Sequence, residues 1–385
     1  MKKIDKEYIK RHIVRYANRI QTEEERMYLH NSCAEAFKKR LERNNIPAEE
    51  PAPGEEEYIK FWQQFCERVE PYTYRFFSRI VGPNPHIVPE DIANLYIESH
   101  LNPEKFRSFY SDKNMYSRYI KPASSVPYSY IFRVNGGLMM SGDDYFDFNI
   151  SSKEVAKIIG DNVQKVVIKP TTDTYGGAKI LLFKRENDAF VHDKIELSGS
   201  YLKSYGKNFA IQEVVEQHPF MNQFCKTSCN TMRIMTYRSI VDESVSVFGA
   251  IQRIGGEGSF VDNITSGGGY IPIDVESGKF GKCAYDHWAR PTDSIHNVSF
   301  NDKEYVLPYW KQAADFAKSI ANQVVHQRLL AQDIVIDKDG NPRLIEFNVG
   351  GFWWGASMYS GRIPLGDKFD EVIEYCLKHK NEIDK

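Results

Sequence analysis

Two carboxylates and one amide near the C-terminal end of the chain have the types and spacing of a metal site. Asp333 stands in an apolar run, the stretch 337–342 is rich in turn residues, and a second apolar run leads to Glu346 and Asn348. This pattern predicts a β-hairpin. Side chains alternate along a strand, so Glu346 and Asn348 would share one face while the apolar residues beside Glu346 point into a core. Oxygen ligands of this kind suit Mg²⁺ bound together with substrate phosphates.

The register of this hairpin decides whether the carboxylates meet. If Ile336 lies opposite Arg343, then Asp333 lies opposite Glu346, because strand pairing keeps the sum of the two residue numbers constant. The competing interpretation is a plain surface hairpin whose polar residues face water. The choice between the two depends on the other motifs in the chain.

A lysine and a glycine-containing loop suggest a phosphate site. Lys169 ends the apolar run 166–168, and a polar loop with Gly176 and Gly177 precedes the next apolar run at 180–183. Backbone N–H groups of such a loop can fold over phosphate oxygens, and a lysine at a strand end can act as a point charge. The sequence lacks a Walker A motif, so an ordinary hairpin with a surface lysine is the competing interpretation.

A further apolar strand ends in carboxylates and could border a nucleotide. Residues 209–211 are apolar and are followed by Gln212, Glu213, Val214, Val215 and Glu216. The end of this strand could offer backbone groups to a planar base and a carboxylate to a ribose. The alternative is a strand that simply leaves the core.

Two arginines stand where neighbouring strands could bring them together. Asn230 and Arg233 open one β-like run, and Arg253 ends the next. On adjacent strands the arginines would suit a forked grip on phosphate or carboxylate, whereas surface ion pairing is the ordinary alternative. The polar, glycine-rich stretch 255–269, which contains Asp262, is long for a loop. Loops of that length are usually functional or disordered.

These candidates must be positioned by a mixture of helices and strands. Residues 1–80 have a helical pattern, interrupted near 44–54 and resumed at 58–69. From about residue 126 onwards, short β-rich runs mix with helical patterns at 152–159 and 309–330. Short strands with a few helices predict an α+β enzyme core that follows a helical N-terminal region.

Composition sets the broad class of the protein. A length of 385 residues suggests two or three domains, and 42 % hydrophobic with 26 % charged residues predicts a folded, soluble chain. With 50 basic and 52 acidic residues, the net charge of −2 argues against a general nucleic-acid or anionic-membrane binder. The 6 cysteines form no C-x-x-C pair. Together with the lack of a signal-peptide core and of a membrane-spanning apolar run, they predict a cytoplasmic protein with reduced thiols.

Taken in order, these residues resemble those of the ATP-grasp superfamily. The ordered set is Lys113, Lys169, Gly176-Gly177, Gln212 to Val215, Asn230 with Arg233, Arg253, and Asp333 with Glu346 and Asn348. The chain looks most like the branch described as sugar-transfer-associated ATP-grasp proteins, through Asn230-Thr-Met-Arg233-Ile, Arg253-Ile-Gly255 and Val261-Asp262-Asn263. The spacing of the metal-site residues is also similar to that of tubulin–tyrosine ligase relatives. The resemblance covers about residues 105–360.

The resemblance implies an α+β fold of the ATP-grasp type, in which two α+β subdomains clamp ATP, preceded by a helical N-terminal region. It implies a helical region at 1–105 and a catalytic domain at 106–375. Within the catalytic domain, a smaller ATP-lid subdomain is expected at about 126–215.

The resemblance also implies a role for each candidate residue. ATP would be held by Lys113, Lys169, Gly176, Gly177 and a hinge of Gln212, Glu213, Val214, Val215 and Glu216, with one of the two glutamates near adenine and ribose. Mg²⁺ would be held by Asp333, Glu346 and Asn348. The catalytic residues would be Arg233, Arg253 and Asn230, the arginines facing the γ-phosphate and the acyl phosphate. The acceptor pocket would be bordered by Asp262, Asn263, Gly267 and Gly268.

The implied activity is that of an ADP-forming carboxylate–amine ligase. A substrate carboxylate would attack the γ-phosphate of Mg-ATP, and an amine would then displace phosphate from the acylphosphate. The expected substrates are small molecules of bacterial surface-glycan assembly, such as a sugar acid, an amino sugar or an amino acid, with no nucleic-acid partner and no membrane insertion. Two alternatives stay open: a kinase on the same fold, and a non-catalytic nucleotide-binding protein, against which the intact carboxylate set argues.

Overall fold

The computed structural model describes residues 6–172, 179–262, 264, 267–296 and 298–380, and for residues 6–22 it describes only the helical backbone. The chain divides into two compact units. The first consists of Met1–His100, Trp353–Pro364 and Val372–Lys385, and the second of Leu101–Phe352 and Leu365–Glu371. The predicted division of function at residue 105 stays a prediction. No helix in the described ranges is long and apolar enough to cross a bilayer.

The first unit is helical, as predicted. Its elements are α1 (Lys6–Arg43), α2 (Glu55–Trp62), α3 (Tyr72–Val81), α4 (Glu90–Ile92), η1 (Ala93–Glu98), most of α5 (Ser99–Leu101), α12 (Gly355–Met358) and most of α13 (Phe369–His379). The predicted helix at 58–69 is wrong beyond Trp62. Pro71 precedes α3 and cannot stand inside a helix, and the Glu70 carboxylate accepts the backbone N–H of Thr73, so a new helix begins there.

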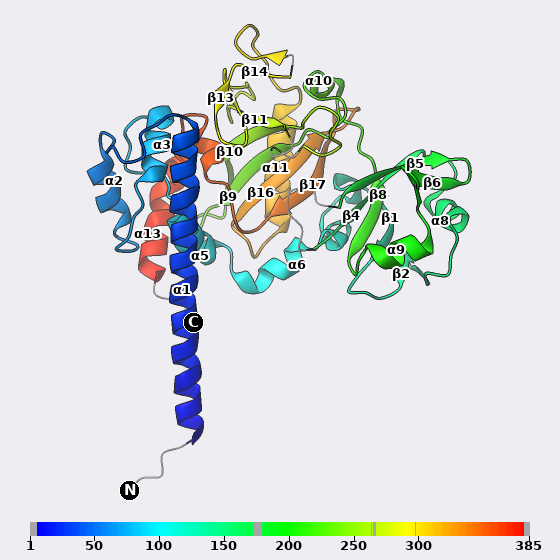
Figure 1. The fold of residues 1–385 in the computed structure, drawn as a ribbon, viewed down its shortest axis with the longest axis horizontal. Helices are drawn as coiled ribbons and strands as arrows, with labels where there is room; N and C mark the ends of the chain where they lie inside the picture. The colour runs from blue at the N-terminus through cyan, green and yellow to red at the C-terminus, as the bar shows by residue number, and fades with distance from the viewer. Residues whose placement is uncertain (1–5, 173–178, 263, 265–266, 297, 381–385) are drawn as a thin grey trace. The chain divides into compact units, whose positions relative to one another are not determined.

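An eight-stranded antiparallel sheet forms one half of the second unit. Its order is β3-β2-β1-β8-β4-β5-β6-β7. The strands are β1 (Ser129–Arg133), β2 (Met139–Ser141), β3 (Asp144–Phe146), β4 (Lys165–Pro170), β5 (Leu181–Glu186), β6 (Ala189–His192), β7 (Ile195–Glu196) and β8 (Phe209–Glu213). Helices α8 (Ser152–Ile159) and α9 (Gly199–Tyr205) pack on this sheet (Figure 1). Ser151 and Glu154 form a capping box that starts α8, which fixes the predicted helix at its N-terminus.

Alternation along the central strands of this sheet separates a core face from a ligand face. Ile168 of β4 lies opposite Ile211 of β8, and both are fully buried in the apolar core under the helices. Lys169 and Gln212, each one residue further along, therefore point to the other face. The polar candidates of two distant segments thus share one surface of the sheet.

A seven-stranded sheet forms the other half of the second unit. Its order is β13-β12-β11-β10-β9-β16-β17. The strands are β9 (Met232–Arg238), β10 (Val245–Ile254), β11 (Gly269–Pro272), β12 (Ala284–Tyr285), β13 (Pro291–Thr292), β16 (Leu329–Ile336) and β17 (Pro342–Asn348). Helix α11 (Trp310–Gln323) crosses one face of this sheet and packs against β9, β10 and β16 (Figure 1). Buried Gln332 donates to the carbonyl of Ala317 on that helix.

The predicted helix at 309–330 is too long. Helix α11 ends at Gln323, and Leu329 and Leu330 belong to β16, whose residues are all buried. An apolar run of this kind suits a buried strand as well as a buried helix, so its periodicity alone misassigns it.

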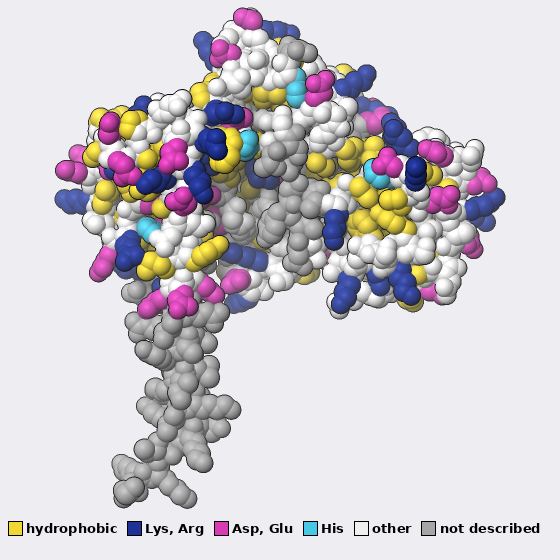
Figure 2. All heavy atoms as spheres, in the orientation of Figure 1, with side chains coloured by type: hydrophobic (Ala, Val, Ile, Leu, Met, Phe, Trp, Pro, Cys, Tyr) yellow, Lys and Arg dark blue, Asp and Glu magenta, His cyan; other side chains and the backbone are white. Residues whose placement is uncertain are grey.

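Short elements connect these parts. They are η2 (Glu104–Phe106), α6 (Arg107–Ser111), η3 (Lys113–Met115), α7 (Tyr116–Tyr119), η4 (Ala123–Ser125), α10 (Pro219–Asn222), the hairpin of β14 (Ser294–Ile295) with β15 (Val298–Ser299), and η6 (Gly366–Lys368). On the face drawn in Figure 2, basic and acidic side chains are interspersed over the described surface. This mixture is in keeping with the near balance of 50 basic and 52 acidic residues.

The predicted hairpin forms, but only half of its predicted register is right. Asp333 lies opposite Glu346, as expected, whereas Ile336 pairs with Pro342 and not with Arg343. The register shifts between Asp333 and Ile334, and Ile345 is the extra residue of a β-bulge. The prediction that both apolar neighbours of Glu346 enter the core is therefore wrong for Ile345, which is half-buried and lines a recess on the ligand face.

Candidate active site

Three charged side chains form a row across neighbouring strands of the seven-stranded sheet. Arg233 of β9 lies opposite Asp333 of β16, which in turn lies opposite Glu346 of β17. Directly opposed residues of an antiparallel sheet point to the same face. The Arg233 guanidinium donates from Nε to Asp333 Oδ1 over 2.8 Å and from Nη2 to Oδ2 over 2.9 Å. The register of the sheet therefore brings these three side chains together.

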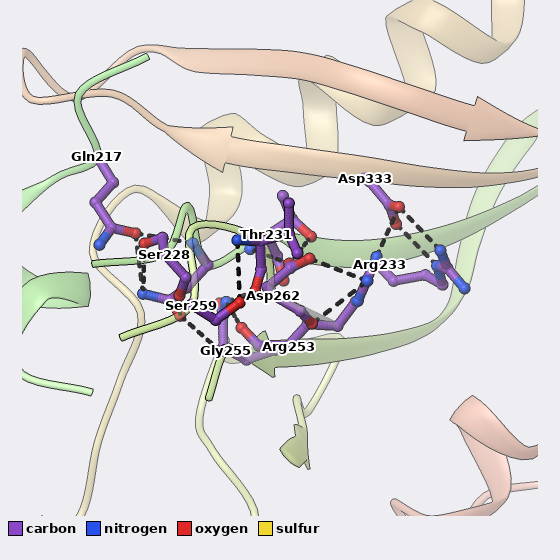
Figure 3. Close-up of polar contacts among 12 residues, drawn as sticks. Gln217, Ser228, Thr231, Arg233, Arg253, Gly255, Ser259, Asp262 and Asp333 are labelled. Atoms are coloured by element: carbon purple, nitrogen blue, oxygen red, sulfur yellow. Dashed lines mark hydrogen bonds and ion pairs between the residues drawn. The ribbon is translucent and has the colours of Figure 1, made fainter. Parts of the chain in front are cut away.

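Arg253 extends this row into a chain of alternating charges. Its Nη1 donates to Asp333 Oδ2 over 2.9 Å, and its Nη2 lies 3.0 Å from Asp262 Oδ1. We call Arg233, Asp333, Arg253 and Asp262 the charge network (Figure 3). The two arginines come from adjacent strands, as the sequence predicted. Their positive charges are matched by two carboxylates of the same chain.

Burial and pairing shift the pKa values within the charge network in opposite directions. Burial disfavours ionisation of Asp333, but Arg233 and Arg253 outweigh it and hold the pKa of this carboxyl below its ordinary value. Burial also opposes the charge on Arg233, yet Asp333 holds the pKa of the guanidinium above its ordinary value. For Asp262, burial dominates and the pKa of its carboxyl is raised, although Arg253 favours the ionised form. Asp333 is therefore a firmly ionised centre, with Asp262 the weaker acid.

Lys113 brings a further cation to this row. Its ammonium lies 3.0 Å from Glu346 Oε2. Two contacts of its segment place it: the Lys113 N–H donates to the carbonyl of Thr171 over 3.1 Å, and the Tyr116 ring stacks on that of Phe347 at 4.8 Å. The first contact reaches the end of β4 and the second reaches β17. The segment thus connects the two sheets and sets Lys113 beside the metal candidates.

Lys169 is the most unusual cation of the site. Its side chain belongs to a residue that is only 7 % exposed, and no described residue gives its ammonium a hydrogen bond or an ion pair. Burial, followed by the nearby charge of Lys113, lowers the pKa of Lys169 to about 8. A buried, unpaired ammonium is costly unless it serves a ligand. This position therefore favours an anion as the missing partner.

A recess on the ligand face brings the predicted nucleotide residues together. It is lined by Lys113, Tyr116, Ser117, Val126, Pro127, Ser129, Lys169, Gln212 and Ile345. Gln212 Nε2 donates to Ser129 Oγ over 2.9 Å, while Gln212 Oε1 is buried and has no hydrogen-bond partner among the described residues. The recess thus combines two ammonium groups, apolar walls and an unused acceptor.

The metal candidates carry the oxygen donors that a divalent cation prefers, although in this structure both Asp333 oxygens accept from arginines and Glu346 is paired with Lys113. Asp333 and Glu346 are close enough for their carboxyl groups to interact, and Asn348 is two residues further along the same face of β17. The Asn348 amide makes no hydrogen bond to a described residue. No group of three or more His, Cys, Asp and Glu side chains in the described ranges is placed to hold a metal.

The predicted hinge residues at the end of β8 and beyond it have different partners. The Glu213 carboxylate accepts the N–H of Tyr128 over 3.0 Å and is paired with Arg343. Glu216 forms a surface ion pair of 2.9 Å with Lys338. Strand β8 ends at Glu213, and Val214 and Val215 are half-buried in the segment that follows. Their predicted roles at adenine and ribose stay predictions.

The Asn230 side-chain amide makes hydrogen bonds through both its nitrogen and its oxygen. Its Nδ2 donates to Cys225 O over 2.7 Å and to Gln217 Oε1 over 3.0 Å. Its Oδ1 accepts the N–H of Gly255 over 3.0 Å and the hydroxyl of Ser228 over 2.8 Å. These bonds tie the loop before β9 to the end of β10. The catalytic role predicted for Asn230 stays a prediction.

The remaining glycine candidates are only partly described. Gly176, Gly177 and Asn263 lie outside the described residues. Gly267 is exposed, with φ of +85°, and Gly268 is buried. A Cβ at Gly268 would lie 2.2 Å from the carbonyl oxygen of Ile254, so the close approach of β10 to this loop requires glycine there.

Three residues of the site were not singled out from the sequence. Ser129 pairs with Gln212 in the sheet register, Ile345 enters the recess through the β-bulge, and Thr231 donates to Asp262. Only Thr231 carried a signal, since it stands between Asn230 and Arg233. The other two depend on register and on a bulge, which sequence patterns do not show.

Comparisons with known proteins place the chain in a family. No curated protein sequence matches it. Among solved structures, the ADP complex of purK, an N5-carboxyaminoimidazole ribonucleotide synthetase, is 12 % identical over 66 % of this chain and 50 % of that one, with a TM-score of 0.36. The D-cycloserine synthetase DcsG is 13 % identical over 72 % and 73 %, with a TM-score of 0.37. The D-alanine–D-alanine ligase from Bacillus anthracis is 13 % identical over 74 % and 71 %, with a TM-score of 0.37. The present chain thus spans about half the length of the purK structure.

A family profile gives the decisive match. The profile described as "Sugar-transfer associated ATP-grasp" matches residues 93–360, which is well over half of the chain. The α+β ATP-grasp fold and the helical region before it, both predicted from the sequence, are confirmed. The chain belongs to the sugar-transfer associated ATP-grasp family.

Proposed function

We propose that this protein is an ATP-dependent, ADP-forming carboxylate–amine ligase that works through an acylphosphate. One observation carries the proposal: two lysines meet in a recess whose Lys113 is paired to Glu346, the residue opposite Asp333. A pair of ammonium groups beside paired carboxylates suits a nucleotide triphosphate bound with a divalent cation. The family match supports the same class of chemistry.

In this proposal, Lys113 and Lys169 hold the ATP phosphates as point charges. Lys169 supplies a strong interaction because its ammonium is buried and unpaired among the described residues. Gln212 and the apolar walls of the recess receive the base. Glu346, Asn348 and Asp333 would hold Mg²⁺, which when bound supplies neutralisation of charge at the phosphate oxygens.

Arg233 and Arg253 stabilise the negative charge of the γ-phosphate and of the acyl phosphate. The substrate carboxylate oxygen forms a bond to the γ-phosphorus as the bond from that phosphorus to ADP breaks. The amine nitrogen then bonds to the acyl carbon, phosphate leaves with the former carboxylate oxygen, and the amine loses a proton. Guanidinium groups fixed by Asp333 are pre-oriented for these charges. By analogy with an oxyanion-hole donor, one such group contributes about 3–4 kcal/mol to stabilising the transition state.

The family description supports a proposed substrate class. We propose a sugar acid, an amino sugar or an amino acid of bacterial surface-glycan assembly as the small-molecule substrate. Asp262, Asn263, Gly267 and Gly268 would border its pocket. Asp262 contacts a proposed catalytic arginine directly.

The test follows ADP and the fate of the carboxylate oxygen. Purified protein is incubated with Mg-ATP, panels of candidate carboxylates labelled with oxygen-18, and amines. A ligase forms ADP only when both substrates are present and transfers one labelled oxygen to inorganic phosphate. A stable phosphorylated product without amine dependence would instead identify a kinase. ATP binding without turnover on any panel would support a non-catalytic nucleotide-binding protein.

A further inference from the structure

We infer that Thr231 and Asp262 are positioning residues that hold the Arg253 guanidinium in its working orientation. The inference rests on the proposed function, because it concerns how the site prepares a positive charge for a phosphoryl group. Thr231 has no role in the proposal above, where Asp262 borders the acceptor pocket and contacts Arg253.

A chain of polar contacts leads from Thr231 through the Asp262 carboxylate to the Arg253 guanidinium. The Thr231 N–H donates to Asp262 Oδ2 over 2.9 Å, and the Thr231 hydroxyl donates to the same oxygen over 2.5 Å. The other oxygen, Asp262 Oδ1, lies 3.0 Å from Arg253 Nη2. One carboxylate oxygen is thus fixed by Thr231 and the other faces the arginine, as Figure 3 shows.

Beyond its bond to Asp333, the Arg253 guanidinium is held by Asp262, through the carboxylate and through a longer 3.4 Å bond from Nη2 to the Asp262 backbone carbonyl. Its Nη1 is held by Asp333, but its Nε is buried and has no hydrogen-bond partner among the described residues. Arg233 differs, since Asp333 grips it through both Nε and Nη2. A two-point grip fixes the plane of a guanidinium, whereas a single contact at one nitrogen lets it rotate. Asp262 therefore supplies the second point for Arg253.

Asp262 in turn depends on Thr231 for its own position. It belongs to no strand and lies in the glycine-rich stretch between β10 and β11, one residue after Val261, which forms an isolated bridge with Cys229. Thr231 immediately precedes β9 and is held by the sheet, because its carbonyl accepts the Arg253 N–H over 2.8 Å. Thr231 is 4 % exposed and Asp262 8 %, so water does not compete strongly for these bonds.

The experiment compares Thr231→Val with Thr231→Ser. Valine keeps the shape and removes the hydroxyl donor, and serine keeps the donor. The probes are MgADP alone and MgADP with orthovanadate, which imitates a phosphoryl group in transfer. Calorimetry measures the affinity for each. Because the lost bond is made to a charged group, Thr231→Val should weaken vanadate binding about tenfold and leave MgADP binding within twofold of wild type. Thr231→Ser should bind both probes as the wild type does.

A second variant and the melting temperatures separate positioning from general damage. Asp262→Asn keeps the size of the side chain and removes its charge, and it should weaken vanadate binding by at least as much as Thr231→Val. Vanadate binding unchanged in Thr231→Val, or loss of both probes in parallel, would overturn the inference. So would a wild-type protein that binds MgADP without vanadate. Failure of the wild type to bind MgADP would instead defeat the proposed function, on which the inference depends.

Discussion

Arg233 and Asp333 face each other across β9 and β16, and two parallel hydrogen bonds of 2.8 and 2.9 Å join the guanidinium to both carboxylate oxygens. The Asp333 side chain is 2 % exposed and that of Arg233 21 %. Such a pair is expensive to desolvate, so its contribution depends on geometry and on further partners. Arg253 supplies one of these partners. The two bonds therefore fix the position of the Arg233 guanidinium on the face of the sheet.

Arg233→Met should lower the free energy of unfolding by about 3 kcal/mol. Removing one partner of a buried pair leaves a carboxylate without full compensation, and the remaining contact with Arg253 keeps the loss at the lower end of the usual range. Urea unfolding measures the change. Lys311→Met is the matched control, because Lys311 forms an exposed pair with Asp315 and its loss should change stability by less than about 0.5 kcal/mol.

A double variant tests the physical reason for that loss. Arg233→Met combined with Asp333→Leu removes the uncompensated carboxylate and should recover part of the stability lost in the single variant. Equal stability of Arg233→Met and Lys311→Met would show that the pair is not a buried charge centre.

Glu346→Gln should weaken divalent-cation binding at least about tenfold, because the amide lacks the charge that a hard cation prefers. Electron paramagnetic resonance of Mn²⁺, used in place of Mg²⁺ with ATP present, measures this affinity. Glu304→Gln is the control, since Glu304 is exposed and pairs with Lys279 at the surface. If both variants bind Mn²⁺ like the wild type, Glu346 is not a ligand.

ATP affinity should fall as the pH rises through about 8. The pKa of Lys169 is lowered to about 8 by burial, so the ammonium that would meet the phosphates is lost above that pH. The dissociation constant should rise by up to about tenfold per pH unit beyond this point. Lys169→Met should bind ATP weakly at every pH, whereas Lys165→Met, an exposed change four residues earlier on β4, should retain the pH dependence. A flat profile in the wild type would contradict the assignment.

The same lysine should make the free protein less stable at neutral pH. Because its folded-state pKa lies below the ordinary value of 10.5, the unfolded chain binds the proton more readily between about 8 and 10.5. The cost of burying the ammonium is therefore complete below about pH 8 and is relieved as the pH rises towards 10.5. Lys169→Met should accordingly raise the melting temperature at pH 7, measured by calorimetry without ligand, and Lys165→Met should not.

Asn230→Ala should reduce the free energy of unfolding by about 3 kcal/mol. The change removes the partners of buried groups on both sides of the loop, among them the Gly255 N–H and the Ser228 hydroxyl. Chemical denaturation of this variant is compared with Asn301→Ala, a change at an exposed position. Identical unfolding curves would mean that the Asn230 bonds contribute nothing to the fold.

The sequence by itself determined the parts of the site that depend on local pattern. Two apolar runs around a turn were enough to predict the hairpin. The structure confirms that Asp333 lies opposite Glu346, but it does so because the β-bulge at Ile345 compensates for a turn register that was predicted wrongly. The helical start of the chain and the α+β core were predicted for the same reason, since periodicity reports burial of one face. The family resemblance added Lys113, whose own segment has no strand pattern to reveal it.

Only the tertiary structure shows which carboxylates pair with which arginines. The β-bulge at Ile345 moved that residue from the core to the recess, and nothing in an apolar run marks such an insertion. Arg253 meets Asp333 across 80 residues of sequence, and Asp262 reaches Arg253 from a loop outside the strands. Local patterns specify which face a side chain takes, but contacts between distant segments depend on register, loop path and the burial of one particular charge beside another.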